Sequence, residues 1–318
     1  MEINQFIAEF TSECPWVQAH TSGSTGAPKP LRLPKSDMRL SARASNLFFG
    51  IGADSHVASP LSPDYIAGKM MCVRALEAGC RFTQLEVSSA IVLPPDTDPI
   101  DLISVVPAQI PSLIEMPELN TRIRKILVGG APASQQTLDA LCAKGVEVWV
   151  SYGMTETCSH VALARGDDPT RIFHAMPGIE FSADASGRLI IIAPDYSFGT
   201  LITNDVVEII DRSSFRWLGR ADNIINSGGL KLVPEQLENE FASILPAGTV
   251  FYVGARPSTK WGSELVLFVE GDDATGRHML ELLDASVSDR RHLPKHVEAV
   301  EHFPRTSSGK IIRNILNS

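Results

Sequence analysis

Short apolar runs alternate with helical stretches through the first half of the chain, and this alternation restricts the fold more than any other feature. The runs at residues 102–106, 125–128 and 147–150 have the length of buried strands. Helical periodicity occupies the segments between and before them, at residues 36–49, 64–78 and 134–143. Since strands that alternate with helices pair into a sheet with helices on its faces, we predict an α/β fold.

The expected helices carry boundary signals of their own. Gly50 and Gly79 follow the first two helices, and glycine readily adopts the left-handed conformation that ends a helix. Ser36 or Asp37 is expected to cap the first helix and Ser134 the third, because short polar side chains accept hydrogen bonds from the first free N–H groups.

The second half of the chain changes to a strand-rich pattern. Residues 188–192 and 206–215 have strand character, with turn sequences at Ser186-Gly187 and at 212–214. This pattern predicts a β-meander that closes a large α/β domain. A new order of strand, helix and strand begins at residue 224 and predicts a small α+β domain.

We therefore expect two domains joined by a short hinge. The large domain covers residues 1–219, the hinge residues 220–222, and the small, mobile domain residues 223–318. A C-terminal part of about a hundred residues falls in the usual range of domain sizes.

Composition excludes several classes of protein. The 318 residues carry a formal charge of −9, which argues against nucleic acid as a partner, since phosphate backbones favour a basic surface. Five cysteines are scattered without a C-x-x-C pair, so neither a disulfide framework nor a zinc site is expected. No signal peptide or membrane-spanning run is visible, and a cytoplasmic location follows as an expectation. The sequence leaves open whether the chain forms homo-oligomers.

A loop of hydroxyl residues and glycines follows a strand expected at residues 16–20. It reads Thr21-Ser22-Gly23-Ser24-Thr25-Gly26-Ala27-Pro28-Lys29. Glycines let backbone N–H groups turn toward a phosphate, and Lys29 supplies a positive charge. Two residues separate Gly26 from Lys29, which excludes a Walker A loop. We expect a phosphate-binding loop, with a flexible polar turn as the alternative.

A second polar cluster, Ser151-Tyr152-Gly153-Met154-Thr155-Glu156, follows the strand expected at 147–150. The Tyr152 ring can stack on a base, and the Thr155 hydroxyl can bind a phosphate. The Glu156 carboxylate suits Mg²⁺, a hard cation that prefers oxygen ligands. A helix cap at Thr155 or Glu156 is the alternative explanation.

Together with three further motifs, these segments resemble the motif series of the adenylate-forming superfamily. That family includes acyl-CoA synthetases, luciferases and the adenylation domains of peptide synthetases. The motifs follow the family order from residue 21 to residue 313. The further motifs are Gly129-Gly130-Ala131-Pro132, Asp205 with Gly219-Arg220-Ala221-Asp222, and Thr306-Ser307-Ser308-Gly309-Lys310.

The resemblance implies ATP, Mg²⁺ and coenzyme A as ligands, and it assigns the nucleotide contacts. The β and γ phosphates would be held by Thr21, Ser22, Gly23, Ser24, Thr25, Gly26 and Lys29. The adenine would lie against Gly130, Ala131, Pro132, Tyr152 and Gly153. The ribose hydroxyls would bind Asp205, assisted by Arg220.

The same resemblance implies the catalytic residues and the hinge. Thr155 would contact the α-phosphate, Glu156 would hold Mg²⁺, and Lys310 would bridge the attacking carboxylate and the α-phosphate. These residue types suit the reaction, because a carboxylate must attack an anionic phosphorus while like charges are neutralised. Asp222 falls at the family's hinge position. For Lys310, the alternative is an ordinary solvated lysine.

The glycine-rich segment Gly228-Gly229-Leu230-Lys231 fits a second half-reaction. In the family, the small domain rotates after adenylation and presents such an edge to the pantetheine of coenzyme A, a hinge motion of a known kind. Gly228, Gly229 and Lys231 are therefore expected to bind coenzyme A. An ordinary glycine turn is the alternative.

The chain departs from the family in two places. Only twenty residues precede Thr21, where most members have a sizeable front region, so the acyl pocket is expected to differ. Many relatives have an aromatic-histidine segment between residues 59 and 79, and here Tyr65 and Lys69 replace it. The expected helix at 64–78 carries two cations, Lys69 and Arg74. Two cations in an apolar helix suggest an acid with a second carboxylate, and snorkelling of both side chains to solvent is the alternative.

This compact form resembles the short o-succinylbenzoate-CoA ligases of menaquinone biosynthesis, whose substrate is an aromatic dicarboxylate. Arg74 falls where those ligases place an arginine near the substrate, so Arg74 is favoured over Lys69. A CoA ligase for another aryl or fatty acid remains an alternative, as does a module that binds ATP or AMP without catalysis.

Overall fold

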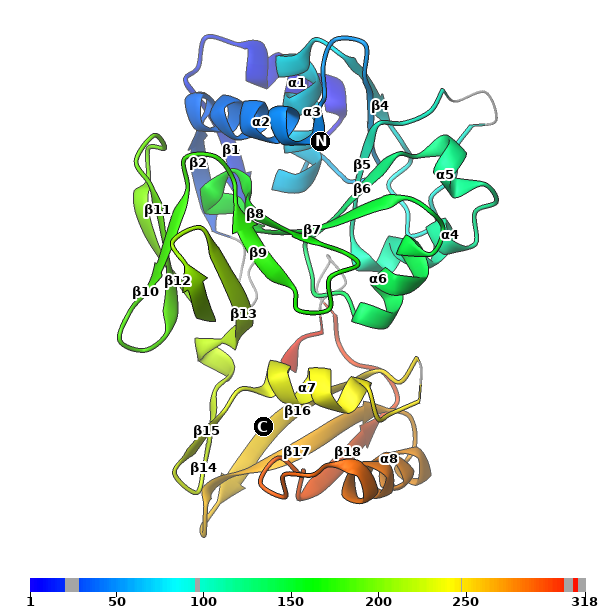
Figure 1. Cartoon of the computed structure of the whole chain (residues 1–318), viewed down its shortest axis with the longest axis vertical. Coiled ribbons are helices and arrows are strands. Elements are labelled where there is room, and N and C mark those ends of the chain that lie inside the picture. Colours follow the sequence, from blue (N-terminus) through cyan, green and yellow to red (C-terminus); the bar gives the residue numbers. More distant parts are fainter. Residues whose placement is uncertain (21–28, 95–97, 247, 306–310, 314–318) are drawn as a thin grey trace. The chain divides into compact units, whose positions relative to one another are not determined.

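The computed structural model describes residues 1–20, 29–94, 98–246, 248–305 and 311–313, and the chain divides into two compact units. Unit 1 comprises Met1–Ser182, Ile190–Leu201 and Ile209–Arg216. Unit 2 comprises Ala183–Leu189, Ile202–Glu208 and Trp217–Ser318. The two units are described separately below, and Figure 1 shows the elements in chain order by colour.

Unit 1 contains a mixed sheet with the strand order β9-β8-β7-β6-β5-β3-β4. The strands from β7 to β4 pair in parallel, whereas β8 and β9 run antiparallel to their neighbours. Every residue of β3 and β5 is buried, as expected for parallel strands covered on both faces. The bounds are β3 (His56–Ser59), β4 (Arg81–Gln84), β5 (Leu102–Val105), β6 (Lys125–Val128), β7 (Glu147–Met154), β8 (Ser159–Arg165) and β9 (Ile172–Ala175).

Helices lie between these strands in the sequence, so the predicted α/β class is confirmed. Helices α2 and α3 lie side by side (Figure 1), and Glu77 of α3 accepts ion pairs from Arg39 and Arg43 of α2. The helices of unit 1 are α1 (Ile3–Thr11), α2 (Lys35–Phe49), α3 (Ile66–Ala78), α4 (Ile110–Ile114), α5 (Leu119–Arg122) and α6 (Gln135–Cys142), with the 3₁₀ turns η1 (Pro107–Gln109) and η2 (Thr155–Thr157).

The predicted ends of α2 and α3 and the predicted cap of α6 are confirmed, whereas the predicted cap of α2 is not. Gly50 and Gly79 end α2 and α3 with φ of 68° and 65°, the left-handed conformation that favours glycine. Ser134 caps α6 by accepting a hydrogen bond from the Thr137 N–H. The cap expected at Ser36 or Asp37 is wrong, because α2 begins at Lys35, and the Asp37 carboxylate instead accepts a hydrogen bond from the Ser197 N–H at 3.1 Å.

A small antiparallel pair precedes the sheet. Strands β1 (Trp16–His20) and β2 (Pro30–Pro34) pair with His20 opposite Pro30. Their buried side chains join α1, α2 and α3 in one apolar cluster that includes Phe6 and Phe10. The strand expected at residues 16–20 is thus confirmed, and it leads directly to the first residue of the predicted phosphate loop.

The predicted meander is present. Strands β10 (Glu180–Ala183), β11 (Arg188–Ala193), β12 (Gly199–Asp211) and β13 (Ser214–Arg220) are neighbours in chain order. Gly187 has φ of 79° in the turn before β11, and Asp184 accepts hydrogen bonds there from the N–H groups of Ser186 and Arg188.

Unit 2 contains a second sheet with two different faces. Its central strand β17 pairs with β14, β16 and β18, and β15 pairs with β14. Leu265, Leu267 and Val269 of β17 face α7 and α8, whereas Val266 and Phe268 pack with Phe303 near the C-terminus. The elements are β14 (Ile225–Ser227), β15 (Leu230–Leu232), α7 (Pro234–Ala242), β16 (Phe251–Ser258), β17 (Gly262–Glu270), α8 (Asp273–Ser286), β18 (His296–Val300) and the 3₁₀ turn η3 (Ala221–Asn223).

Within residues 223–318 the sequence also predicts a helix at 234–244 and strands at 249–253 and 264–270. The helix is α7, which ends at Ala242 rather than at residue 244, and the two strands are β16 and β17. Unit 2 contains further segments before residue 217, so its bounds differ from those expected for the small domain. Within the described ranges, no helix has both the length and the apolar character needed to cross a membrane.

Candidate functional site

Two of the predicted nucleotide motifs meet at the carboxyl ends of β6 and β7. The Ser151 hydroxyl donates a hydrogen bond to the Val128 carbonyl oxygen at 3.0 Å. A Cβ atom on Gly129 would lie 2.3 Å from the Ser151 Oγ, so only glycine permits this close approach. The segment that begins with Gly130, Ala131 and Pro132 thus starts beside the Tyr152 end of β7, at the edge of a parallel sheet where ligands usually bind.

A tight turn holds Thr155 and Glu156 directly after β7. A Cβ atom on Gly153 would lie only 2.0 Å from the Ser159 carbonyl oxygen, which explains the glycine. The Thr157 hydroxyl lies 2.7 Å from that same oxygen and accepts a hydrogen bond from the Met154 N–H at 3.0 Å. The two candidate residues are thereby fixed in the single 3₁₀ turn η2.

The two candidate side chains of this turn differ in exposure, because Thr155 is buried and Glu156 is half-buried. Thr155 Oγ1 lies 3.5 Å from the carbonyl oxygen of His20, the last residue before the predicted phosphate loop. In the described part of the chain, no hydrogen bond or ion pair engages the half-buried Glu156 carboxylate, and no group of three His, Cys, Asp or Glu side chains could hold a metal. A single carboxylate fits Mg²⁺, which takes its remaining ligands from phosphates and water.

The Tyr152 ring is held by aromatic packing. Its centroid lies 5.0 Å from that of Phe215 and 5.8 Å from that of Phe173. Such contacts fix the orientation of the ring. Contact with an adenine remains a prediction.

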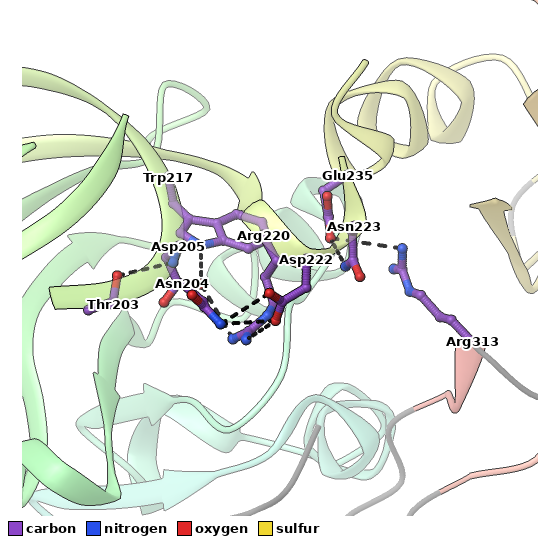
Figure 2. A network of polar contacts seen from close by, with 9 residues as sticks. All are labelled: Thr203, Asn204, Asp205, Trp217, Arg220, Asp222, Asn223, Glu235 and Arg313. Atoms are coloured by element: carbon purple, nitrogen blue, oxygen red, sulfur yellow. Dashed lines mark hydrogen bonds and ion pairs between the residues drawn. The ribbon is translucent and has the colours of Figure 1, made fainter. Parts of the chain in front are cut away.

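Unit 2 brings together the predicted ribose acid and its arginine (Figure 2). The Trp217 Nε1–H donates a hydrogen bond to the Asp205 carboxylate at 3.1 Å. The Arg220 guanidinium lies 3.8 Å from Asp205 and 3.0 Å from Asp222. Arg220 is therefore shared between the predicted ribose acid and the predicted hinge residue.

The predicted hinge residue is bonded on two sides. The Asn204 side-chain amide donates to both Asp222 oxygens at 3.1 Å, so β12 and η3 are joined through Asp222 (Figure 2). Gly219 of the same motif lets the Glu235 carboxylate approach, since a Cβ atom there would lie 2.5 Å from Glu235 Oε2. Glu235 in turn accepts a hydrogen bond from Asn223.

The predicted coenzyme A edge is a β-hairpin. Gly228 and Gly229 join β14 to β15 with φ of 56° and 83°, the conformation of a two-residue turn that glycine favours. A Cβ atom on Gly228 would lie 2.8 Å from the Trp261 ring. Lys231 is exposed and, with Arg188 and Asn226, lines a hollow of about 480 Å³. The local structure is therefore the glycine turn that the sequence analysis gives as the alternative. Binding of coenzyme A by this hairpin stays a prediction.

The two cations of α3 are buried in separate places. Lys69 and Arg74 are each only 1% exposed, so neither snorkels to solvent. The Lys69 ammonium lies 4.8 Å from the Phe6 ring centroid and 3.6 Å from the Met1 sulfur. Burial lowers the pKa of Lys69, and nearby carboxylates partly oppose this effect. The structure gives Lys69 and Arg74 no common partner among the described residues.

Arg74 has an unusual set of partners for a buried charge. Its guanidinium donates to Ser45 Oγ at 2.8 Å, to Met71 Sδ at 3.3 Å and to Ser159 Oγ at 3.3 Å. It also donates to His160 Nδ1 at 3.2 Å. All four partners are uncharged, and within the described ranges no carboxylate pairs with Arg74. Burial lowers the pKa of Arg74 to about 10, so the side chain stays charged at neutral pH.

Three of these partners were missed by sequence reasoning. Ser45 comes from α2, and Ser159 and His160 open β8. One signal was available, since Ser159 and His160 follow the Thr155-Glu156 motif by three and four residues. Cys158 and Ser159 have φ of 55° and 102°, a strained conformation for residues other than glycine, which is typical of functional sites.

Some predicted residues lie outside the described ranges. They are Thr21, Ser22, Gly23, Ser24, Thr25 and Gly26 of the phosphate loop, and the catalytic candidate Lys310. Lys29, the last residue of the predicted loop, is described and exposed.

Comparison with known families and sequences relates this chain to AMP-binding enzymes and to CoA ligases. The model of a family described as AMP-binding enzyme matches residues 8–185. A 2-succinylbenzoate–CoA ligase of Listeria monocytogenes is 25% identical, with 93% of this chain and 68% of the relative covered. A 2-succinylbenzoate–CoA ligase of Bacillus cereus is also 25% identical, with 97% of this chain and 71% of the relative covered.

Solved structures agree on the fold. An acyl-CoA synthetase (AMP-forming)/AMP-acid ligase II-like protein from Dyadobacter fermentans is 33% identical, with a TM-score of 0.64, and the match covers 96% of this chain and 90% of that one. The o-succinylbenzoate CoA synthetase (MenE) from Bacillus subtilis, in complex with its acyl-adenylate intermediate, is 22% identical, with a TM-score of 0.78. That match covers 95% of this chain and 68% of the other.

Proposed function

Because this chain belongs to the family of AMP-binding enzymes, we propose that it is an AMP-forming acid–CoA ligase whose acid is o-succinylbenzoate. In the first half-reaction, a carboxylate oxygen of the acid attacks the α-phosphorus of ATP, and pyrophosphate leaves. In the second, the thiol of coenzyme A attacks the acyl carbon, and AMP leaves. The product, o-succinylbenzoyl-CoA, belongs to menaquinone biosynthesis.

The observation that carries the choice of acid is the buried guanidinium of Arg74, which has only neutral partners among the described residues. A buried charge is normally paired, because its desolvation is otherwise uncompensated. A dicarboxylate supplies the missing partner, since one carboxylate can react while the other binds Arg74. The two relatives named as 2-succinylbenzoate–CoA ligases support this assignment.

The adenine end uses the motifs at the edge of the large sheet, where Gly130, Ala131 and Pro132 line the adenine together with Tyr152 and Gly153. The family motif in unit 2 supplies Asp205 and Arg220 for the ribose. Thr155 donates its hydroxyl to the α-phosphate. Glu156 holds Mg²⁺, which neutralises phosphate charge when it is bound.

Charge neutralisation at the reacting atoms comes from two lysines. Lys29 and the loop that precedes it hold the leaving pyrophosphate. Lys310 bridges the attacking carboxylate and the α-phosphate, where like charges crowd in the transition state. Asp222 is the hinge for the second half-reaction, which brings Gly228, Gly229 and Lys231 to coenzyme A.

The test is a screen for AMP formation with ATP, Mg²⁺ and a panel of carboxylic acids, with and without coenzyme A. We expect o-succinylbenzoate to give AMP and a thioester, and Lys310→Ala to slow pyrophosphate release by about 100- to 1,000-fold. Turnover of another acid in preference would refute the acid assignment but keep the ligase class. If no acid yields AMP and Lys310→Ala leaves ATP binding unchanged, the chain is a nucleotide-binding module instead.

A further inference from the structure

The described partners of Arg74 are neutral hydrogen-bond acceptors, and none of them carries a negative charge. His160 is 3% exposed, and its Nδ1 accepts a hydrogen bond from the guanidinium. Burial, and then the charge of Arg74, hold the pKa of His160 well below its ordinary value, so the ring is neutral. A neutral ring whose Nδ1 accepts a hydrogen bond carries its proton on Nε2.

The proton on Nε2 has no acceptor within the described part of the chain, and the atom is fully buried. Buried donors are almost always satisfied, so an exception calls for an explanation such as a ligand that is absent. The Phe49 ring lies edge-on to the imidazole, with centroids 6.4 Å apart, and it limits how far the ring can rotate. A fixed donor and an uncompensated cation thus lie next to each other.

We propose that His160 is a positioning residue that determines the specificity for the acid. Its neutral Nδ1 accepts a hydrogen bond from the Arg74 guanidinium and orients it without neutralising its charge. Arg74 and His160 together can then bind the second carboxylate of the acid. This inference rests on the proposed function, because it concerns the acid that the ligase activates. A carboxylate at position 160 would lie within ion-pair distance of Arg74 and would take the place of the substrate's own carboxylate.

The backbone supports this role. Ser159 and His160 emerge from the strained turn at Cys158 and Ser159, and the Ser41 hydroxyl donates to the Cys158 carbonyl oxygen at 3.2 Å. Strain of this kind persists only where the surrounding structure holds it. Cys158 ends the 3₁₀ turn that holds Thr155 and Glu156, so Ser159 and His160 follow the predicted Mg²⁺ ligand Glu156 by three and four residues in the sequence.

The test compares His160→Asp with His160→Gln by calorimetric binding of o-succinylbenzoate, a readout that does not require turnover. Glutamine keeps a neutral acceptor and a donor, so we expect its Kd to stay within about threefold of the unsubstituted protein. Aspartate neutralises Arg74, so we expect binding to weaken by on the order of 100-fold. Thermal melting serves as the control for folding, and we expect the aspartate variant to melt no lower than the glutamine variant, because it gains an ion pair.

Binding by the aspartate variant within threefold of the unsubstituted protein would overturn the inference. So would a loss in the glutamine variant as large as the loss in the aspartate variant. If the aspartate variant does not fold, His160→Glu replaces it in the same comparison. Failure of the proposed function has a different signature, because o-succinylbenzoate then neither binds the unsubstituted protein nor yields AMP, whereas another acid does.

Discussion

Arg74 in unit 1 and Arg220 in unit 2 carry the same charge in opposite surroundings. Arg74 is buried and donates only to neutral atoms, whereas the side chain of Arg220 is 32% exposed and lies between the carboxylates of Asp205 and Asp222. A paired, partly exposed arginine links elements of the protein and adds little stability. A buried arginine without a carboxylate lowers stability unless a ligand supplies the charge. The contrast distinguishes Arg220, which connects parts of the chain, from Arg74, which we propose binds the substrate.

The largest expected effect follows from removing the buried charge. Arg74→Met should lower kcat/KM for o-succinylbenzoate by about 100- to 1,000-fold, because it removes one partner of a buried charge pair in the complex. The free energy of unfolding should fall by no more than about 1 kcal/mol, since the lost hydrogen bonds are offset by the removal of an unpaired charge. Steady-state kinetics and chemical denaturation measure the two quantities.

The matched control is Arg43→Met on the neighbouring helix α2. Arg43 is exposed and pairs with Glu77, so its loss should leave kcat/KM unchanged. A strongly destabilised Arg74→Met that retained its selectivity for the dicarboxylate would mean that Arg74 is a structural residue.

A smaller effect is expected at the paired arginine. Arg220→Met should raise the KM for ATP by about tenfold, because Asp205 loses the guanidinium that assists it at the ribose. Stability should change by less than about 1 kcal/mol, as for other partly exposed ion pairs. An unaltered KM for ATP, measured by pyrophosphate release, would remove Arg220 from the nucleotide site; Arg212→Met, at an exposed arginine, is the control.

The hinge residue should separate the two half-reactions. Asp222→Ala breaks the bonds to Asn204 and Arg220, and we expect thioester formation to slow by about tenfold while pyrophosphate release changes by less than about twofold. Single-turnover assays of each step measure the split. Equal slowing of both steps would argue against a hinge role.

The smallest effect concerns reactivity near Arg74. Burial raises the pKa of both Cys72 and Cys158 to about 12, so neither thiol should form a thiolate at pH 8. We expect iodoacetamide to label the partly exposed Cys14 in the folded protein, and to label Cys72 and Cys158 only after denaturation. Mass spectrometry of the labelled peptides distinguishes them, and early labelling of Cys158 would mean that the region around Arg74 opens readily.

The two regions also differ in how far the sequence predicts them. Arg220 and Asp222 stand two residues apart, and their proximity follows from local geometry together with the family motif. Arg74 was recognised as a candidate because a cation in an apolar helix is conspicuous. Its partners were not predicted, because Ser45 and His160 reach it from α2 and β8 only after the tertiary fold forms.

The same reasoning explains the error at the start of α2. Local pattern favours Ser36 or Asp37 as a cap, but Asp37 instead bonds Ser197, which is 160 positions away in the sequence. Long-range hydrogen bonds of this kind override local capping preference, and periodicity in a single sequence carries no signal for them. The alternation of strands and helices, by contrast, is a local signal and was confirmed.

The central claim is that Arg74 recognises one carboxylate of o-succinylbenzoate while the other reacts. The most direct measurement is a double-mutant cycle that pairs Arg74→Met with analogues of the acid that lack either the ring or the chain carboxylate. We predict that the analogue without the reacting carboxylate is inactive. The analogue without the carboxylate that binds Arg74 should react slowly, and at the same rate, with the unsubstituted protein and with Arg74→Met. The 100- to 1,000-fold loss expected on removing Arg74 is then confined to the dicarboxylate. An equal loss with the dicarboxylate and with the analogue that still reacts would contradict the claim.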